Sequence, residues 1–574
     1  MDITITPGGL AGTVTPPPSK SQAHRLLIAA ALAQGESVIT NVARSQDIVA
    51  TVNCLEELGA GFSWAGSAVT VRGMGANAMS PLRRMAYPRL DCGESGSTLR
   101  FLIPIALAVR GGGIFTGRGR LMERPLKPYF DLFDEKGIFY EQKDGQLTVA
   151  GMLTPGEYRL PGDVSSQFFT GLLFALPLLN GPSAIIPTTP LESEGYIQMT
   201  LQAMGQFGVE MPVTMSLPPQ YHPRGNQTYR AADAEVEADW SQAAFWYAAM
   251  YLWDVDVQGM NLRSAQGDRV MADYYDRFFM WADSFDLSNC PDLAPPLAVM
   301  AALRSGGGVT RLTNAARLRL KESDRLASVT AVLNALGGDV TEGPDSLTIR
   351  GKDALAGGVK VDSFNDHRIA MMAAIAAARC EKPVTITGAE CVAKSYPNFW
   401  EEYERLGGKL RRRYDLSLAP IGPDNWKQAV LLTTDPERLN PLDQQWVTSN
   451  AFSLLQAAYD PAWTCRLILS DGKPVGFAFF GLWEERGGVP LLCRYMIDVD
   501  CQGRGLGAQA LPLVLEEMYA VYGPVEIYLT VEPENVRAVR LYERFGFRPT
   551  GEFDCTEAAY VRPAPGGKND HKEL

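Results

Sequence analysis

Residues 365–378 read NDHRIAMMAAIAAA, a short polar start followed by an unbroken run of alanine, methionine and isoleucine. A helix made from this run is apolar on every side, which predicts that it is buried all round. The combination occurs five more times, as SKSQAHRLLIAAALAQG (19–35), GESGSTLRFLIPIALA (93–108), DVSSQFFTGLLFALPLLNG (163–181), ADWSQAAFWYAAMYL (238–252) and PDLAPPLAVMAAL (291–303). Six such segments predict a repeat architecture over residues 1–412.

The rest of each repeat is also visible in the sequence. A second helix with a terminal glycine follows most copies, as in VATVNCLEELGA (49–60) and YFDLFDEKG (129–137). Glycine just past a helix suits the left-handed conformation that ends many helices. Strand-like stretches such as SLTIRG (346–351) lie between the helices. The pattern predicts an α/β fold.

The helix starts indicate a ligand. Ser, Asp, Asn or Glu opens each segment, and a helix N-terminus with free N–H groups is a natural anion site. Basic residues gather at or near these starts, namely Lys20, Arg25, Arg100, Arg124, Lys321, Arg325, Arg368 and Lys394. Capped structural repeats would explain the acids and serines alone. The added cations favour a strongly anionic ligand.

Composition excludes several classes of protein. The 574 residues include 53 Lys and Arg against 65 Asp and Glu, a net charge of −12, which argues against a general nucleic-acid or anionic-membrane binder. No apolar run is long enough to span a bilayer, and the start MDITITPGGL does not look like a signal peptide. Nine scattered cysteines fit reduced thiols, so we expect a cytoplasmic protein. With four histidines and no Cys-x-x-Cys, no metal site is expected.

Eight short motifs identify the family that residues 1–412 resemble. They are PSKSQAHR (18–25), GESGSTLR (93–100), MERP (122–125), GDVSSQ (162–167), PDLAPP (291–296), LRLKESDR (318–325), NDHR (365–368) and AKSYPNF (393–399). Together they resemble 5-enolpyruvylshikimate-3-phosphate synthases. The resemblance implies a two-domain enolpyruvyl transferase fold of six βαβαββ repeats, an inverse α/β barrel. One domain would comprise residues 20–232, and the other residues 1–19 with 233–412.

The resemblance also implies an activity and a site. The enolpyruvyl group of phosphoenolpyruvate would pass to the 5-hydroxyl of shikimate-3-phosphate, with loss of phosphate and without a cofactor. Shikimate-3-phosphate would be bound by Lys20, Ser21, Arg25, Ser165, Ser166, Gln167, Ser193, Tyr196, Asp292 and Lys321. Phosphoenolpyruvate would be bound by Lys20, Gly96, Arg124, Gln167, Arg325, Arg368 and Lys394. Asp292 would accept a proton, while Lys321 and Glu322 would handle protons at the reacting carbon beside Lys20.

Two positions depart from the family pattern, and two alternatives stay open. Glu94 and Arg317 stand where many members have asparagine, so they would either pair with each other or tune substrate affinity. One alternative is the related transferase acting on UDP-N-acetylglucosamine. That family usually has a loop cysteine, and GRGRLMERP (117–125) contains none. The other is a noncatalytic anion-binding homologue, against which Lys321, Glu322 and Asp292 argue.

Residues 416–562 read as a second α/β domain. RLILSDG (466–472) and KPVGFAFFGLW (473–483) predict a hairpin with an Asp-Gly turn. QGRGLG (502–507) predicts a glycine-rich strand-to-helix turn able to bind a pyrophosphate. With VEPENVRAVRLYERFGF (531–547), this segment resembles GNAT-family acetyltransferases. The resemblance implies acetyl-CoA as co-substrate, bound by Ile497, Val499, Gln502, Gly503, Arg504, Gly505, Gly507 and Asn535, with Tyr542 protonating the leaving thiolate.

The acetyl acceptor is expected to be an amine. The segment is most like spermidine and diamine acetyltransferases, and a noncatalytic regulatory module that binds acetyl-CoA is the alternative. Residues 563–574, PAPGGKNDHKEL, are expected to be a disordered tail. We expect a monomer with no nucleic-acid or membrane partner.

Overall fold

The computed structural model describes residues 1–75, 87–214, 216–435, 443–444 and 447–565. The chain divides into two compact units, Ile3–Arg411 and Arg412–Leu574, the second together with Met1–Asp2. Each unit is described by itself. Most of the tail expected at residues 563–574 lies outside the described residues.

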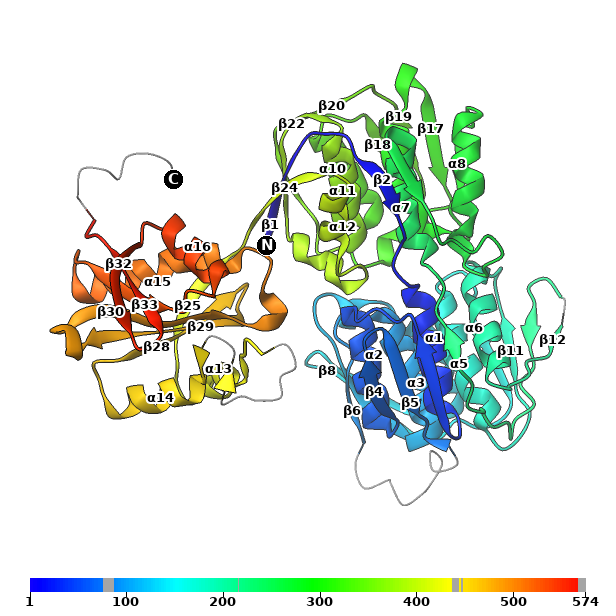
Figure 1. Ribbon diagram of the computed structural model, residues 1–574. Helices are drawn as coiled ribbons and strands as arrows, with labels where there is room; N and C mark the ends of the chain where they lie inside the picture. Colours follow the sequence, from blue (N-terminus) through cyan, green and yellow to red (C-terminus); the bar gives the residue numbers. More distant parts are fainter. Residues whose placement is uncertain (76–86, 215, 436–442, 445–446, 566–574) are drawn as a thin grey trace. The chain divides into compact units, whose positions relative to one another are not determined.

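Six helices in the described part of the first unit are buried, as the repeated segments predicted, and most of them are labelled in Figure 1. They are α1 (Lys20–Leu32), α3 (Gly96–Arg110), α5 (Ser166–Ala175), α7 (Trp240–Leu252), α9 (Ala294–Ala302) and α11 (His367–Ala378). All twelve residues of α11 are buried. Five of the six are capped by the side chain just before them, from Ser19, Ser95, Ser165, Asp239 and Asp366. The helix α9 instead follows a single 3-10 turn, η6 (Pro291–Leu293).

A second helix accompanies each of these six. The set is α2 (Gln46–Leu58), α4 (Lys127–Lys136), α6 (Glu194–Gln206), α8 (Met271–Phe279), α10 (Arg325–Ala335) and α12 (Phe399–Arg405). Gly59 and Gly137 end α2 and α4 with φ of 110° and 65°, as the terminal glycines predicted. The sequence did not single out α8, whose C-terminal cap is Met280 rather than glycine.

Among the described residues, five four-stranded sheets share one order, and in four of them a parallel pair is followed by two antiparallel pairings. In sheet order they are β14 (Ala234–Glu235), β3 (Glu36–Thr40), β5 (Ala68–Arg72), β4 (Gly61–Ala65); β6 (Arg89–Asp91), β7 (Gly112–Thr116), β9 (Gln146–Ala150), β8 (Phe139–Lys143); β10 (Glu157–Leu160), β11 (Ala184–Pro187), β13 (Gln220–Tyr221), β12 (Val213–Thr214); β16 (Ser284–Asp286), β17 (Val309–Thr313), β19 (Leu347–Arg350), β18 (Val340–Glu342); and β21 (Lys360–Asp362), β23 (Val384–Thr387), β1 (Asp2–Thr6), β24 (Lys409–Arg413).

The repeat that begins with α7 has a smaller sheet than the other five. Its helices α7 and α8 accompany a two-stranded parallel sheet of β2 (Ala11–Val14) and β15 (Asp254–Val257) instead of a four-stranded one. A separate two-stranded parallel sheet is formed by β20 (Leu355–Gly357) and β22 (Cys380–Lys382). The repeats are also shared between distant segments, since Ala234 of β14 pairs with Ile39 and Ile3 of β1 pairs with Ile386. One continuous core joins buried residues from Ala23 to Val236.

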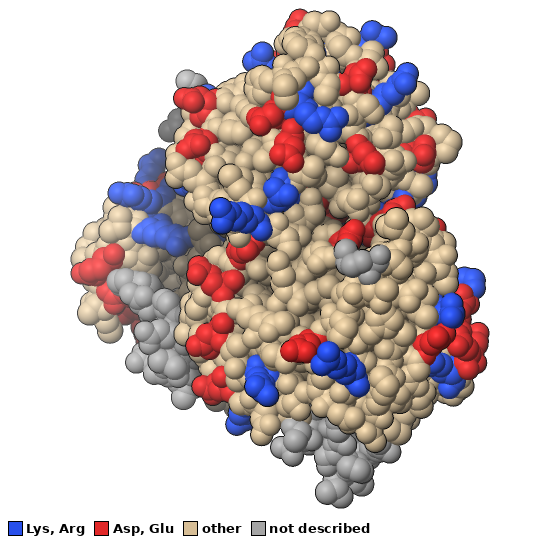
Figure 2. Space-filling model, turned by 90° about the vertical axis from the view of Figure 1, so that its right-hand side faces the viewer, with Lys and Arg blue, Asp and Glu red and all other residues tan. Residues whose placement is uncertain are grey.

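The surface mixes charges of both signs. Figure 2 shows Lys and Arg side chains interspersed with Asp and Glu over one face of the molecule. An anion site is therefore to be sought in a recess rather than on this face.

The second unit is built on one seven-stranded sheet. Its order is β25 (Leu416–Pro420), β28 (Thr464–Ser470), β29 (Lys473–Trp483), β30 (Val489–Ile497), β31 (Ile527–Val531), β33 (Glu557–Arg562) and β32 (Arg548–Asp554). Its helices are α13 (Trp426–Leu431), α14 (Asn450–Tyr459), α15 (Leu506–Tyr522) and α16 (Val536–Arg544). The predicted hairpin is present as β28 and β29, with Asp471 and Gly472 at φ of 50° and 74°.

One pairing in this sheet matters for the site. The parallel strands β30 and β31 pair only at Leu491–Tyr528 and Leu492–Leu529. The carboxyl end of β30, from Cys493 to Ile497, is therefore not paired with β31, and the sheet opens at that end.

Candidate active sites

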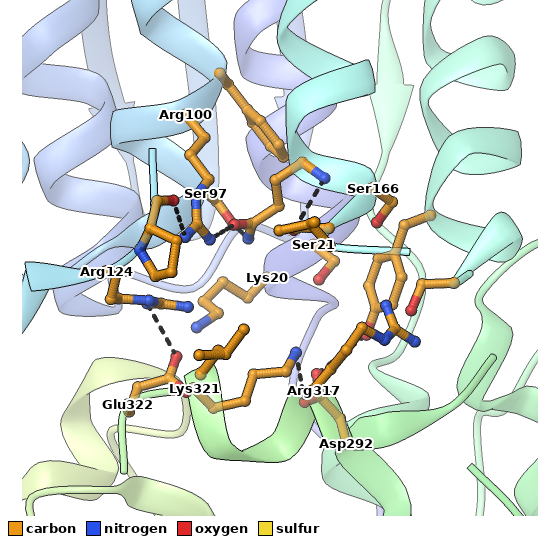
Figure 3. Close-up of a pocket in the computed structure, with 18 of the residues that line it drawn as sticks. Lys20, Ser21, Ser97, Arg100, Arg124, Ser166, Asp292, Arg317, Lys321 and Glu322 are labelled. Carbon is orange, nitrogen blue, oxygen red and sulfur yellow. Dashed lines mark hydrogen bonds and ion pairs between the residues drawn. The ribbon is translucent and has the colours of Figure 1, made fainter. Parts of the chain in front are cut away.

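A cavity in the first unit collects the starts of its buried helices (Figure 3). Its walls include Lys20, Ser21, Arg25, Ser97, Arg100, Arg124, Ser165, Ser166, Gln167, Ser193, Tyr196, Asp292, Arg317, Lys321, Glu322, Arg325, His367 and Arg368. These residues come from helices far apart in the sequence, and their N-terminal N–H groups add to the positive charge of the side chains. The cavity is therefore suited to a polyanion.

Asp292 lies at the centre of a cation cluster. Its carboxylate accepts bonds from Arg325 Nη1 at 2.7 Å, Arg368 Nη2 at 2.9 Å and Tyr196 Oη at 3.1 Å, with Lys321 Nζ 3.4 Å away. Burial alone would raise its pKa, but Arg368, Lys321 and Arg325 hold the pKa of this carboxyl well below its usual range. Asp292 is therefore ionised at neutral pH and can accept a proton.

Lys321 and Glu322 form the neighbouring pair. Glu322 accepts a bond from Arg325 Nη2 at 2.7 Å and lies 3.8 Å from Arg124 Nη1. Burial opposes ionisation of Glu322, yet Arg325, Arg124 and Lys321 hold its pKa well below the usual range. Burial lowers the pKa of Lys321, which makes its ammonium a readier proton donor.

Serines and two buried arginines line the side of the cavity that is formed by α1, α3 and α5. Arg25 is fixed by the Ser21 carbonyl at 2.6 Å and by Thr200 Oγ1 at 2.8 Å, and burial lowers its pKa to about 10. Arg100 Nη1 donates to Gln167 Oε1 at 2.7 Å, and burial lowers the pKa of Arg100 to about 9. Both remain cations at neutral pH.

Asp47 contacts a predicted site residue but was not recognised in the sequence. Lys20 Nζ bonds to Asp47 Oδ2 at 2.6 Å, and the Lys20 backbone N–H donates to Asp239 Oδ2 at 3.0 Å. Asp47 lies in the first turn of α2, where an acid is favourable for any helix, so its sequence position carried no functional signal.

Two predicted residues do not line this cavity. Gly96 lies beneath Arg124, where an added Cβ would come within 2.6 Å of the Arg124 Nη1 atom. Lys394 Nζ is bonded to Glu94 Oε2 at 2.6 Å and to the Asn365 carbonyl at 2.7 Å. Glu94 and Arg317 do not pair with each other, because Arg317 contacts Glu192 and the Ser288 carbonyl.

His367 faces the cavity, although it is not among the site residues that the sequence predicted. It is 2% exposed, and neither ring nitrogen has a hydrogen-bond partner in the described part of the chain. Burial, together with Lys20 and Arg368, lowers its pKa well below the usual value, so the ring is neutral. A neutral, unpaired imidazole on the wall is free to bond to a ligand.

A second cavity of about 720 Å³ lies in the other unit, a volume typical of ligand sites. Its walls bring together Tyr495, Ile497, Val499, Gln502, Gly503, Gly505, Gly507, Asn535 and Tyr542, all but Tyr495 being predicted cofactor or catalytic residues. Arg504, predicted to touch the pyrophosphate, is exposed and does not line it. Gly503 and Gly505 both have φ of 80° ahead of α15, which frees the backbone N–H groups there.

Two tyrosines line this cavity. Tyr542 is buried, and burial raises its pKa above the usual value, with the Glu557 carboxylate adding to the shift. The Tyr542 phenol therefore carries its proton at neutral pH, although the raised pKa makes it a weaker acid than a free tyrosine. Tyr495, which the sequence did not flag, donates from Oη to the Gly507 carbonyl at 2.6 Å and so holds the glycine-rich turn against β30.

Sequence comparison decides the family. The profile of EPSP synthase (3-phosphoshikimate 1-carboxyvinyltransferase) matches residues 5–277 and 281–403. The chain belongs to the EPSP synthase family. It is 44% identical over 427 residues to the 3-phosphoshikimate 1-carboxyvinyltransferase of Clostridium kluyveri, covering 71% of this chain and 98% of that protein. The corresponding protein of Clostridioides difficile is 42% identical over 431 residues, with 71% and 98% covered.

A solved structure agrees in fold. The EPSP synthase of Acinetobacter baumannii aligns with a TM-score of 0.59 at 24% identity, covering 72% of this chain and all of that one. The remainder of this EPSP synthase-family chain matches a different family, since the Acetyltransferase (GNAT) profile covers residues 429–547. The enzyme class is thus a 3-phosphoshikimate 1-carboxyvinyltransferase with a GNAT acetyltransferase domain.

Within the described ranges, no group of three or more His, Cys, Asp or Glu side chains is placed to hold a metal ion. None of the helices described is long and apolar enough to cross a membrane.

Proposed function

We propose that the cavity of the first unit holds shikimate-3-phosphate and phosphoenolpyruvate together. The observation that carries this proposal is the ionised Asp292 within a cluster of cations beside Lys321 and Glu322. Shikimate-3-phosphate is assigned to Arg25, Ser21, Ser165, Ser166, Gln167, Ser193 and Tyr196. Phosphoenolpyruvate is assigned to Lys20, Arg124, Arg325, Arg368 and Lys394, with Gly96 leaving room for Arg124.

The chemistry follows from two proton positions. The oxygen of the 5-hydroxyl bonds to the enol carbon of phosphoenolpyruvate, and Asp292 takes the proton that this hydroxyl loses. Lys321 with Glu322 supplies a proton to the neighbouring methylene carbon, which gives a tetrahedral adduct. Loss of that proton and of phosphate restores the double bond, so no cofactor enters the balance.

Phosphate release tests these roles. The chain should release phosphate from phosphoenolpyruvate only when shikimate-3-phosphate is present, and UDP-N-acetylglucosamine should not replace it. Removing a general base typically costs about 10²–10⁴-fold in rate, so Asp292→Ala should lower kcat by that range. Normal turnover by Asp292→Ala would remove Asp292 from the mechanism.

We also propose the division of this unit into residues 20–232 and residues 1–19 with 233–412. The continuous core from Ala23 to Val236 supports it. A monomer in the cytosol completes the proposal. The nine free cysteines support the cytosolic location. Size-exclusion chromatography with light scattering would test whether the protein is a monomer.

For the GNAT domain we propose acetyl transfer to an amine, with a polyamine as the finer assignment. The Glu557 carboxylate influences both Tyr542 and Cys493, so it places negative charge near the predicted thiolate side of the cavity. Ile497, Val499, Gln502, the three glycines and Asn535 would hold acetyl-CoA. A polyamine ammonium would be drawn to such a carboxylate.

Thiol release from acetyl-CoA by the full chain tests this assignment. Spermidine, spermine and diamines should support release, and Glu557→Gln should weaken it through KM for the amine. Turnover on amino acids but not polyamines would overturn the acceptor. Tight acetyl-CoA binding with no turnover on any amine would favour the regulatory alternative.

A further inference from the structure

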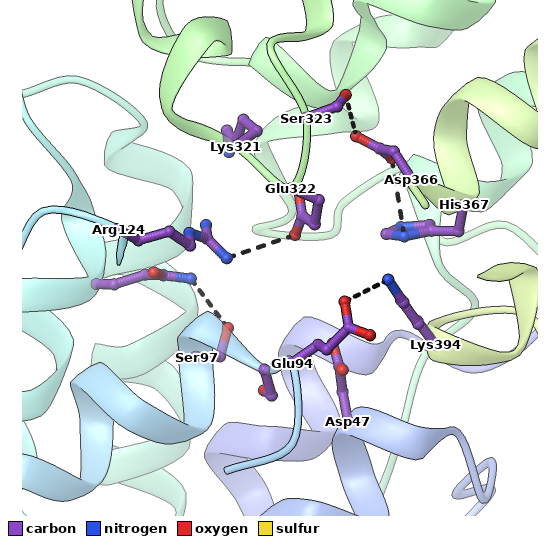
Figure 4. Close-up of polar contacts among 12 residues, drawn as sticks. Asp47, Glu94, Ser97, Arg124, Lys321, Glu322, Ser323, Asp366, His367 and Lys394 are labelled. Carbon is purple, nitrogen blue, oxygen red and sulfur yellow. Dashed lines mark hydrogen bonds and ion pairs between the residues drawn. The ribbon is translucent and has the colours of Figure 1, made fainter. Parts of the chain in front are cut away.

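Glu94 forms a compact polar cluster with Lys394, to which it is bonded in Figure 4, and with Asn365. Its Oε2 atom lies 2.6 Å from Lys394 Nζ and accepts a bond from Asn365 Nδ2 at 3.0 Å. Lys394 also donates to the Asn365 carbonyl at 2.7 Å. All three side chains thus meet at the start of α3 and the end of the 3-10 turn η9 (Ala389–Lys394).

The Glu94 carboxylate packs against Gly119, which has no side chain to occupy the same space. Gly119 has φ of 55°, and an added Cβ would lie 2.9 Å from Glu94 Oε2. The Lys394 side chain is only 5% exposed and that of Glu94 is 30% exposed. A buried ammonium needs a negative partner, and in this structure Glu94 supplies it.

This pairing has a consequence for ligand binding. Lys394 is the one predicted phosphoenolpyruvate cation that does not line the cavity, whereas Arg124, Arg325 and Arg368 all do. A phosphate or carboxylate that bonds to Lys394 would compete with Glu94 for the same ammonium. A neutral side chain at position 94 would not compete by charge.

We propose that Glu94 is an internal competitor of phosphoenolpyruvate for Lys394 and so sets the affinity for that substrate. This inference rests on the proposed role of Lys394 as a phosphoenolpyruvate ligand. Glu94 acts through Lys394 and does not enter the chemical steps.

The test compares KM values for the two substrates in the full-length protein. Glu94→Gln should lower KM for phosphoenolpyruvate by about three- to tenfold, the range expected for removing one competing, partly buried charge. KM for shikimate-3-phosphate should change by less than about twofold. Glu517→Gln is the matched control, because it removes a partly buried carboxylate that pairs with Arg466 in the other unit and should leave KM for phosphoenolpyruvate unchanged.

A double variant separates the two proposals. In the Lys394→Ala background, Glu94→Gln should no longer lower KM for phosphoenolpyruvate. An unchanged or raised KM in Glu94→Gln, with Lys394→Ala still raising it, would overturn the competition and leave Lys394 as a ligand. If Lys394→Ala left KM unchanged, the assignment of Lys394 itself would fail.

Discussion

At the scale of single residues, Asp268 is a carboxylic acid held in an unfavourable place. It is 2% exposed, Oδ2 accepts the Ser241 hydroxyl, and Oδ1 has no partner among the described residues. Burial, with Asp292 adding to it and Arg368 opposing it, raises the pKa of Asp268 to about 7. The folded state therefore binds a proton that the unfolded chain, with a pKa of about 3.9, loses.

The sign of the resulting pH effect can be worked out. The stability that this proton contributes is fully present below the unfolded pKa and is lost as the pH rises to about 7. Asp268→Asn keeps an acceptor for Ser241 and removes the titration. Relative to the parent, it should gain about 1–3 kcal/mol in the free energy of unfolding between pH 5 and pH 8. Denaturant titrations at both pH values measure this gain, and an equal effect of the substitution at each pH would contradict it.

A second prediction at the scale of single residues concerns Gly96. A methyl group there would meet the Arg124 guanidinium at 2.6 Å, which forces the side chain to move. Gly96→Ala should raise KM for phosphoenolpyruvate by about tenfold or more, because the Arg124 guanidinium loses its alignment. Gly205→Ala is the control. This glycine lies inside α6 with nothing within 4 Å of an added Cβ, so the change should leave KM unaltered and stabilise the helix slightly. Equal KM values for the parent and Gly96→Ala would contradict the expected shift of Arg124.

At the scale of elements, the two ends of α15 allow a matched comparison. Gly505 before the helix and Gly523 after it both have φ of 80°. Valine at either position should cost stability of about 1–3 kcal/mol through backbone strain. Only Gly505→Val should abolish acetyl-CoA binding by calorimetry, because only that end faces the cavity. Loss of binding in Gly523→Val as well would show that strain alone explains the effect.

Elements also show how far the sequence could predict this protein. The six buried helices, the side-chain caps of five of them and the β28–β29 hairpin follow from patterns within a few residues and were predicted, but α9 begins after a 3-10 turn without such a cap. Contacts between distant segments were not, such as Ala234 beside Ile39, Lys20 with Asp47, or Glu94 with Lys394. The motifs did assign most of the cavity wall, because each helix start carries its own ligand-type side chains. The isolated charges at positions 47 and 94 had no local pattern that pointed to a partner.

At the scale of the whole molecule, the two units carry separate cavities. A ligand that binds only the folded state stabilises what it binds, by about 2.7 kcal/mol at 100 times its Kd. Thermal unfolding should therefore show two transitions. Shikimate-3-phosphate should raise the midpoint of one, and acetyl-CoA that of the other. A single transition raised by either ligand would show instead that the units unfold together.

Because distant segments share strands, the sheets of the first unit can be completed only in a fixed order as the chain is synthesised. Once residue 236 has left the ribosome, β14 can complete the sheet that holds β3, and the core from Ala23 to Val236 has all its members. The first strand made, β1, must wait for β23 at Val384–Thr387 and β24 at Lys409–Arg413. During that interval the nascent chain exposes an unpaired strand, which makes it dependent on protection from aggregation. The second domain follows β24 in the chain, so a translational pause after β24 has left the ribosome would favour correct assembly of the synthase.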